Sequence, residues 1–215
     1  CYIRQGRYHE TITIDDLDGS SGSAIVFTNY NNERVVIDGT TPITSTWTRV
    51  GSTNIWKTKL SADIWQLFIN WEEQVMARWP NAKFSDDTIW DNDNYWAKGT
   101  IDDDENAYTN GTIIDDPYTN SAGTAIDLNA TGFDLDETNK QAIAILNLGS
   151  FKTWSRLVTS HSGNTFNYAT VPTWKTKHHY YYLEGRKEFL DQEGEWWYDC
   201  LLYTSPSPRD KVRSR

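Results

Sequence analysis

The sequence predicts an all-β protein in which short stacked strands are followed by a larger antiparallel β domain. Through residue 46, β-rich runs of a few residues recur about every ten residues, separated by turn formers such as "DDLDGSSGS" and "NNE". From residue 47, longer segments such as "WTRVGSTNIWKTKL" indicate two strands joined by a turn. The chain has 11 Trp and 12 Tyr but a single Met, a composition typical of β proteins.

The strands of residues 1–46 are expected to form the first coil of a solenoid. The runs "CYIRQGRY", "TITI", "AIVFTNY" and "RVVIDG" are joined by connections of unequal length, without the repeated Asn-Gly or Asp-Gly turns of tight hairpins. Apolar runs with polar interruptions suit short strands in a solenoid, where each coil covers the next.

Residues 47–178 are expected to form an inserted antiparallel β domain. One hairpin is predicted around Gly51-Ser52, and a second within "DIWQLFINWEEQVMARWPNA", which Pro80 ends. Residues 98–138 are rich in Asp, Asn, Thr and Gly, which predicts a long acidic loop with one strand at "AIDL". The β pattern returns in "QAIAILNLGSFKTWSRLVTSHSGNTFNY".

Three segments carry a resemblance to a known family. They are the first coil, "MARWPN", and the segment "HHYYYLEGRKEFLDQEGEWWYD". Together they resemble the N-terminal part of right-handed parallel β-helix (pectin-lyase-like) glycoside hydrolases that carry an inserted β-sandwich. The resemblance implies that residues 47–178 are sandwich-like and that residues 179–199 return to the β-helix. Trp71 departs from the resemblance, because the relatives usually have Gly there.

Both ends of the chain are expected to be truncated. Residues 200–215, with two Ser-Pro steps and four basic residues, resemble a translated sequencing adapter and are expected to be a non-native tail; a natural disordered tail is the alternative. The first residues, "CYIRQGRYHE", begin in mid-pattern without a signal peptide. Because Cys200 lies in the expected tail, any disulfide partner of Cys1 is expected upstream.

Charge and hydropathy bear on the partners. Lys and Arg number 20 against 30 Asp and Glu, a net charge of −10. A nucleic-acid partner is therefore not expected, because binding phosphates needs a basic face. No apolar run approaches the ~20 residues of a membrane span. This composition fits a secreted or periplasmic protein that binds a neutral or weakly charged ligand, and the resemblance implies that the ligand is a polysaccharide or oligosaccharide.

The resemblance implies a secreted glycoside hydrolase. Such enzymes use two carboxyl groups that flank the scissile bond, and the resemblance places both on later coils outside this sequence, so the chain alone is expected to be inactive. Two alternatives stay open: a polysaccharide lyase of the same fold, which needs a base to abstract a proton, and a non-catalytic glycan-binding β-helix module. Sugar, linkage and stereochemistry are not predicted.

Asp191 and Glu195 are the candidate catalytic carboxylates within the chain. They lie beside Trp196, and an aromatic wall both desolvates an acid and stacks on a sugar. The alternative is structural: Asp191 caps a helical turn, Gly194 supplies a positive φ, and Trp196 fills the end of a coil.

Trp96, Trp154 and Arg78 are the candidate carbohydrate-binding residues. The two Trp follow polar segments and are less obviously core residues than Trp65 and Trp79. Arg78 can pair with a substrate carboxylate, or it can lay its stem over an aromatic ring and bond a neighbouring acid.

No metal or cofactor motif is complete. The clusters "DNDN" (91–94) and "DDDE" (102–105) contain the oxygen ligands that calcium prefers, but they lack the spacing of an EF-hand loop, so a solvated acidic loop competes with a calcium site. The histidines at positions 9, 161, 178 and 179 have no zinc spacing and are expected at the surface. Ser160 beside His161 makes no nucleophile motif, since adjacency in sequence is not a hydrogen bond.

Overall fold

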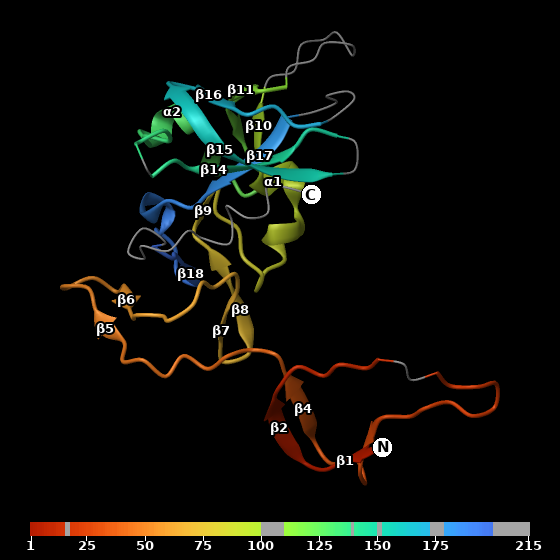
Figure 1. Ribbon diagram of the computed structural model, residues 1–215. Helices are drawn as coiled ribbons and strands as arrows, with labels where there is room; N and C mark the ends of the chain where they lie inside the picture. Colours follow the sequence, from red (N-terminus) through yellow and green to blue (C-terminus); the bar gives the residue numbers. More distant parts are fainter. Residues whose placement is uncertain (16–17, 100–109, 139, 150–151, 173–178, 200–215) are drawn as a thin grey trace. The chain divides into compact units, whose positions relative to one another are not determined.

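The computed structural model describes the chain except for residues 16–17, 100–109, 139, 150–151, 173–178 and 200–215 (Figure 1). The expected tail therefore lies outside the described residues. Strands make up 37% of the structure and helices 8%, which confirms the all-β class. The chain divides into two compact units, Cys1–Ala62 and Asp63–Arg215. This division comes later than residue 46, so the first predicted hairpin belongs to the N-terminal unit.

The N-terminal unit contains parallel strand pairs. Its strands are β1 (Tyr2–Ile3), β2 (Gly6–His9), β3 (Thr28–Asn29), β4 (Val35–Asp38), β5 (Thr48–Arg49) and β6 (Trp56–Lys57). β1 pairs with β3 and β2 with β4, both in parallel, whereas β5 and β6 form the predicted antiparallel hairpin. The described residues do not show a parallel β-helix.

Little apolar surface is buried in the N-terminal unit. Within its described residues Asp38 alone is buried, and its carboxylate contacts Arg7 and His9 of the neighbouring strand. The aromatic and aliphatic side chains of Tyr2, Val26 and other strand residues stay exposed. Polar contacts between β2 and β4 therefore hold this unit together more than a core does.

The C-terminal unit holds most of the secondary structure. Its strands are β7 (Leu67–Ile69), β8 (Glu72–Met76), β9 (Arg78–Trp79), β10 (Ala97–Gly99), β11 (Thr112–Ile114), β12 (Tyr118–Thr119), β13 (Ala125–Ile126), β14 (Ile143–Asn147), β15 (Thr153–Ser162), β16 (Thr165–Tyr168), β17 (His179–Glu184) and β18 (Glu195–Trp196). Its helices are η1 (Thr88–Trp90), α1 (Asn92–Tyr95), α2 (Leu128–Thr131) and η2 (Lys187–Phe189). The second predicted hairpin is confirmed by the antiparallel pairing of β7 and β8.

The main sheet of this unit closes on itself. Its described strands lie in the order β10-β17-β14-β15-β16-β11, with β9 also paired to β17, and all the pairs are antiparallel. The two end strands meet, because Gly99 and Asp115 form a bridge and the Asp116 N–H donates to the Lys98 carbonyl at 2.8 Å. A single closed antiparallel sheet thus stands where a sandwich-like domain was expected.

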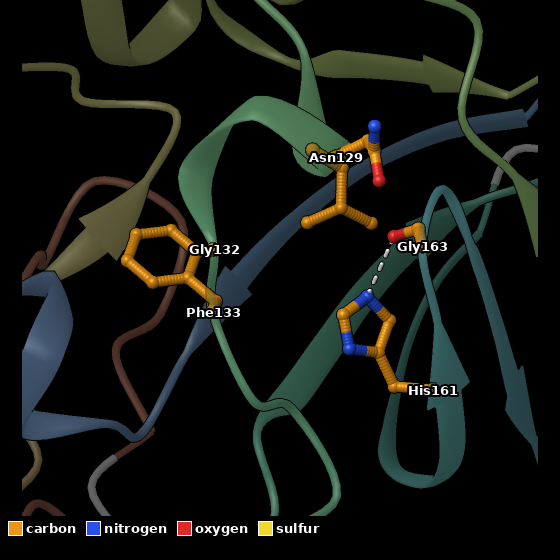
Figure 2. Close-up of a pocket in the computed structure, with 6 residues that line it drawn as sticks. Asn129, Gly132, Phe133, His161 and Gly163 are labelled. Atoms are coloured by element: carbon orange, nitrogen blue, oxygen red, sulfur yellow. Dashed lines mark hydrogen bonds between the residues drawn. The ribbon is translucent and has the colours of Figure 1, made fainter.

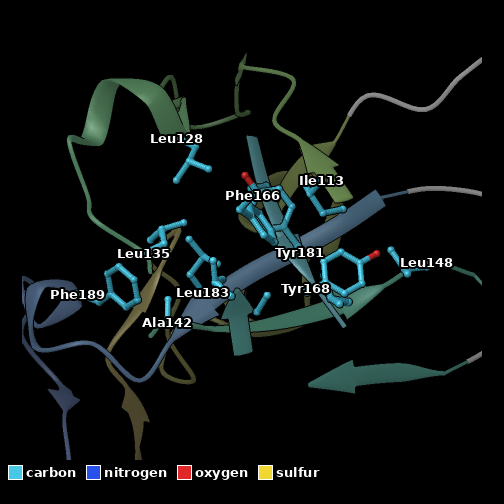
Figure 3. Close-up of a cluster of buried hydrophobic side chains, with 14 of the residues drawn as sticks. Ile113, Leu128, Leu135, Ala142, Leu148, Phe166, Tyr168, Tyr181, Leu183 and Phe189 are labelled. Atoms are coloured by element: carbon cyan, nitrogen blue, oxygen red, sulfur yellow. The ribbon is translucent and has the colours of Figure 1, made fainter. Parts of the chain in front are cut away.

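The core fills the inside of this closed sheet (Figure 3). Burial alternates along β14 and β17, as expected for strands with one face turned to the core. Phe166 and Tyr181 pack edge to face with ring centres 5.1 Å apart. The buried carboxylate of Asp115 accepts hydrogen bonds from the Tyr181 hydroxyl at 2.5 Å and the Leu128 N–H at 2.9 Å. The buried Asp115 carboxylate is thereby paired.

The segment expected to be an acidic loop, residues 98–138, contains regular structure. Its described part includes β11, β12, β13 and α2. Asp127 caps α2 by accepting from the Ala130 N–H at 3.2 Å, and Gly132, with φ of 68°, ends it. Ile113 and Leu128 are buried, so this polar segment supplies part of the core.

The segment 179–199 begins in the middle of the closed sheet. β17 lies between β10 and β14, so residues 179–184 belong to the antiparallel domain. β18 then pairs in parallel with β8, Glu195 opposite Val75 and Trp196 opposite Met76. Close to this pair, the Tyr198 hydroxyl donates to the Asp63 carboxylate at 2.8 Å.

Candidate functional site

The segments that contain Arg78, Asp191 and Glu195 meet in the structure. We call residues 74–81 and 191–196 the β8–β18 junction. The Ala77 N–H donates to the Trp196 carbonyl at 2.7 Å, and the Trp196 indole N–H donates to the Gln74 carbonyl at 3.0 Å. The two candidate carboxylates thus lie on a turn that packs against the strand preceding Pro80.

Glu195 stabilises the turn that precedes it. Its Oε2 accepts from the backbone N–H of Asp191 at 3.2 Å and of Gln192 at 3.1 Å. Burial raises the pKa of the Glu195 carboxyl, and these two N–H donors oppose that rise. A carboxyl with a raised pKa suits a general acid, but both hydrogen bonds here serve the turn.

Asp191 is held by a distant residue. Its Oδ1 accepts from the Asn81 amide at 2.8 Å. The structural role predicted for this turn is therefore correct in outline. It is wrong in one detail, because the side chain that caps the turn is Glu195 and not Asp191. Gly194 has the expected positive φ, 88°, and Trp196 is buried.

The junction has an excess of buried acceptor oxygens. Among the described residues, Asn81 Oδ1, Gln192 Oε1 and Glu195 Oε1 are buried without a hydrogen-bond donor. A buried acceptor without a donor costs about 1–3 kcal/mol. Burial also favours the uncharged, protonated form of the Glu195 carboxyl.

Arg78 is buried and does not present its guanidinium to a surface ligand. It is 2% exposed, its Nε donates to the Pro80 carbonyl at 2.8 Å, and its Nη2 donates to the Tyr95 carbonyl at 2.9 Å. The guanidinium lies 3.7 Å from the centre of the Tyr182 ring. Burial lowers its pKa to about 10. The structural alternative for Arg78 is therefore correct in the contact with an aromatic ring, but the guanidinium bonds two backbone carbonyls rather than a neighbouring acid.

Trp96 and Trp154 are half-buried and pack in different surroundings. Trp96 meets Tyr182 edge to face, with ring centres 4.8 Å apart. Trp154 lies between Lys152 and Arg156, whose cationic groups are 5.7 and 5.8 Å from the centre of its ring. Its indole N–H is buried without a partner among the described residues. The structure does not combine these two rings into one stacking platform.

Other tryptophans are more exposed than the candidates. Trp65, expected in the core, is 53% exposed, whereas Trp79 packs against the core as expected. Trp71 and Trp90 are exposed by 58% and 73%. Sequence position alone did not separate these rings, because the polar neighbours used as the signal surround buried and exposed Trp alike.

The acidic and histidine clusters do not form a metal site in the described part of the chain, where no group of three or more His, Cys, Asp or Glu side chains is arranged to hold a metal ion. In "DNDN", Asp91 caps α1 by accepting from the Asn94 N–H at 3.1 Å. "DDDE" lies outside the described residues. His179 is buried rather than at the surface, and His178 lies outside the described residues.

A pocket of about 200 Å³ lies on the C-terminal unit (Figure 2). Leu128, Asn129, Gly132, Phe133, His161 and Gly163 line it. No local sequence motif predicts this pocket. Two separate segments form its wall: α2 with the residues after it, and the turn between β15 and β16.

Comparison of the chain with protein-family models, with curated proteins and with solved structures gives no match. Within the described residues, none of the helices has the length and apolar character needed to cross a lipid bilayer.

Proposed function

We propose that this chain is the first part of a secreted polysaccharide-degrading protein, in which a parallel β-helix begins, an antiparallel β domain is inserted, and the β-helix resumes. The parent acts as a glycoside hydrolase through two carboxylates on later coils. The polymer is neutral or weakly charged, because the chain carries a net charge of −10 and would repel a strongly acidic polymer.

The β8–β18 junction carries this proposal. "MARWPN" and "LDQEGEW", the two segments with the most specific resemblance, are separated by more than a hundred residues, yet Asn81 bonds Asp191 across them at 2.8 Å. Residues that serve one shared junction explain why both segments occur together. The parallel pairs β1–β3 and β2–β4 add support, because they join residues about 26 to 29 positions apart, a spacing that suits one coil of a solenoid.

A non-catalytic glycan-binding role for this part of the molecule is the second candidate. The hydrogen bonds of Asp191 and Glu195 favour it, since these carboxylates hold the turn together. Both candidates predict that this chain binds a polysaccharide without cleaving it. They differ in whether a longer protein that contains this chain hydrolyses the polysaccharide.

Two measurements on residues 1–199 test the proposal. Affinity electrophoresis through gels that contain xylan, a neutral fucose-containing polymer or acidic pectin is expected to show retardation by a neutral polymer and none by pectin. Release of reducing ends from the same polymers is expected to be absent. Retardation by pectin alone, or by none of the polymers, would contradict the proposal.

One outcome would move the active site into the chain. If residues 1–199 release reducing ends and Asp191→Asn or Glu195→Gln abolishes the release with the fold intact, the β8–β18 junction is catalytic. Gln192→Ala serves as a control, because it removes a neighbouring side chain without removing a carboxylate.

A further inference from the structure

The pocket beside α2 combines rigid walls with unused polar groups. Figure 2 shows the ring of Phe133 on one side of it and the ring of His161 on the other, with the Asn129 amide above the His161 ring. The walls come from two segments, 128–133 and 161–163, which the fold brings together.

Hydrogen bonds fix the position of His161. Its backbone N–H donates to Asp136 Oδ2 at 3.0 Å, and its Nε2 lies 2.9 Å from the Gly163 carbonyl. A carbonyl accepts only, so Nε2 carries the proton in this contact, and in the neutral ring Nδ1 is left as an acceptor. The side chain of Asn129 makes no hydrogen bond within the described residues, so its amide offers both a donor and an acceptor to a ligand.

The apolar wall is equally fixed. Phe133 packs edge to face against Phe189, with ring centres 4.9 Å apart, and against Trp79 at 6.4 Å. Leu128 is 1% exposed and belongs to the core. The aromatic wall is thus anchored to the core, which lowers the entropy cost of binding a ligand against it.

We propose that this pocket binds one neutral sugar residue, such as the end of a glycan chain. Its volume of about 200 Å³ lies below the roughly 300–1,000 Å³ of sites for larger ligands, so it holds no more than a single ring. No Lys, Arg, Asp or Glu lines it, which favours an uncharged ligand. An amide, an imidazole acceptor and an aromatic wall provide hydrogen bonds to hydroxyl groups and an apolar contact for the ring. The inference rests on the proposed function for its ligand class.

Nuclear magnetic resonance on ¹⁵N-labelled residues 1–199 tests the pocket directly. Glucose, galactose, mannose, xylose, arabinose and fucose are titrated separately. At least one is expected to shift the amide signals of residues 128–133 and 161–163 and few others. Asn129→Ala and His161→Ala are expected to weaken that binding at least tenfold, whereas Thr159→Ala, an exposed change on β15, leaves it unaltered. The spectra of the variants also report whether each is folded.

The outcomes separate this site from the proposed function. If no sugar shifts the amide signals, or if the shifted signals belong to residues outside the pocket, the proposed sugar site is contradicted. If Asn129→Ala and His161→Ala both keep polymer binding in affinity electrophoresis, the proposed function is supported, but the pocket is not the site that binds the polymer. If a monosaccharide binds in the pocket but no polymer retards the chain, the sugar site is supported and the proposed polysaccharide function is contradicted.

Discussion

Trp71 occupies a backbone position that suits glycine. At the turn between β7 and β8, Asn70 and Trp71 have φ of 52° and 77°. This left-handed conformation costs residues with a Cβ about 1–2 kcal/mol, a cost that glycine avoids. Trp71, where the resemblance leads us to expect Gly, therefore raises the energy of the backbone, although the hairpin still forms.

Replacing Trp71 tests that strain. Trp71→Gly is expected to be more stable than Trp71→Ala by about 1 kcal/mol, because both variants lose the indole but only glycine relieves the backbone. Urea unfolding of the two variants measures the difference. Equal stabilities would show that the turn carries no strain at this residue.

Glu195 is expected to make stability depend on pH. Its folded-state pKa is raised above the usual 4.5, chiefly by burial. The contribution of its protonated form is therefore complete below the unfolded-state pKa and is lost as the pH rises through the folded-state pKa. Glu195→Gln removes this titration, so the variant should gain stability relative to the wild type between about pH 4 and about pH 7.

Thermal unfolding at both pH values measures this effect. Glu193→Gln, a change of the same charge at an exposed neighbour, serves as the control and should show a smaller change with pH. A Glu195→Gln variant whose stability relative to the wild type is constant across this range would contradict the role given to burial.

At the scale of elements, the closure of the main sheet depends on Gly99. A Cβ at this position would lie 2.8 Å from His179 Cβ and 3.1 Å from Ile113 Cγ2. Gly99→Ala is expected to destabilise the C-terminal unit by about 1–3 kcal/mol, the usual cost of overpacking. Chemical denaturation measures the change. Gly39→Ala, at a position with open space around it and no positive φ, is the comparison, and an equal loss of stability there would contradict closure as the cause.

Local patterns predicted some elements and missed others. The β7–β8 hairpin and the strands around residues 143–168 have runs of β-forming residues that the sequence displays directly. The strands of residues 110–126 each bury very few side chains, and Thr112 pairs with Asn167, far along the chain. β11 thus depends on a distant partner, while β12 and β13 form a very short local pair, so composition alone predicts a loop.

The candidate site was predicted in its parts but not in its geometry. The sequence identified Asp191 and Glu195 and the structural alternative for their turn, but it did not indicate that Asn81 holds Asp191. Arg78 was considered as a surface ligand because local sequence does not reveal burial under Tyr182. The pocket at Asn129 and His161 requires the tertiary fold, since neither segment has a motif.

At the scale of the whole molecule, the two units differ in how they are stabilised. Every buried apolar residue of the described chain lies in the C-terminal unit, beginning at Val75. Since apolar burial is the main source of folding free energy, residues 1–62 are expected to exchange their amide hydrogens faster than β14 and β17. Hydrogen exchange followed by mass spectrometry measures this. Equal protection in both units would show that residues 1–62 have another source of stability.

The Tyr198 hydroxyl donates to the Asp63 carboxylate at 2.8 Å, so side chains near the beginning and the end of the described C-terminal unit are in contact. A folded domain whose two ends lie close together can replace a short loop of a host chain. The host then has to span only the distance between those ends, whatever the length of the insert. We therefore expect that residues 63–198, when grafted into a surface loop of an unrelated scaffold, leave the fold of that scaffold intact.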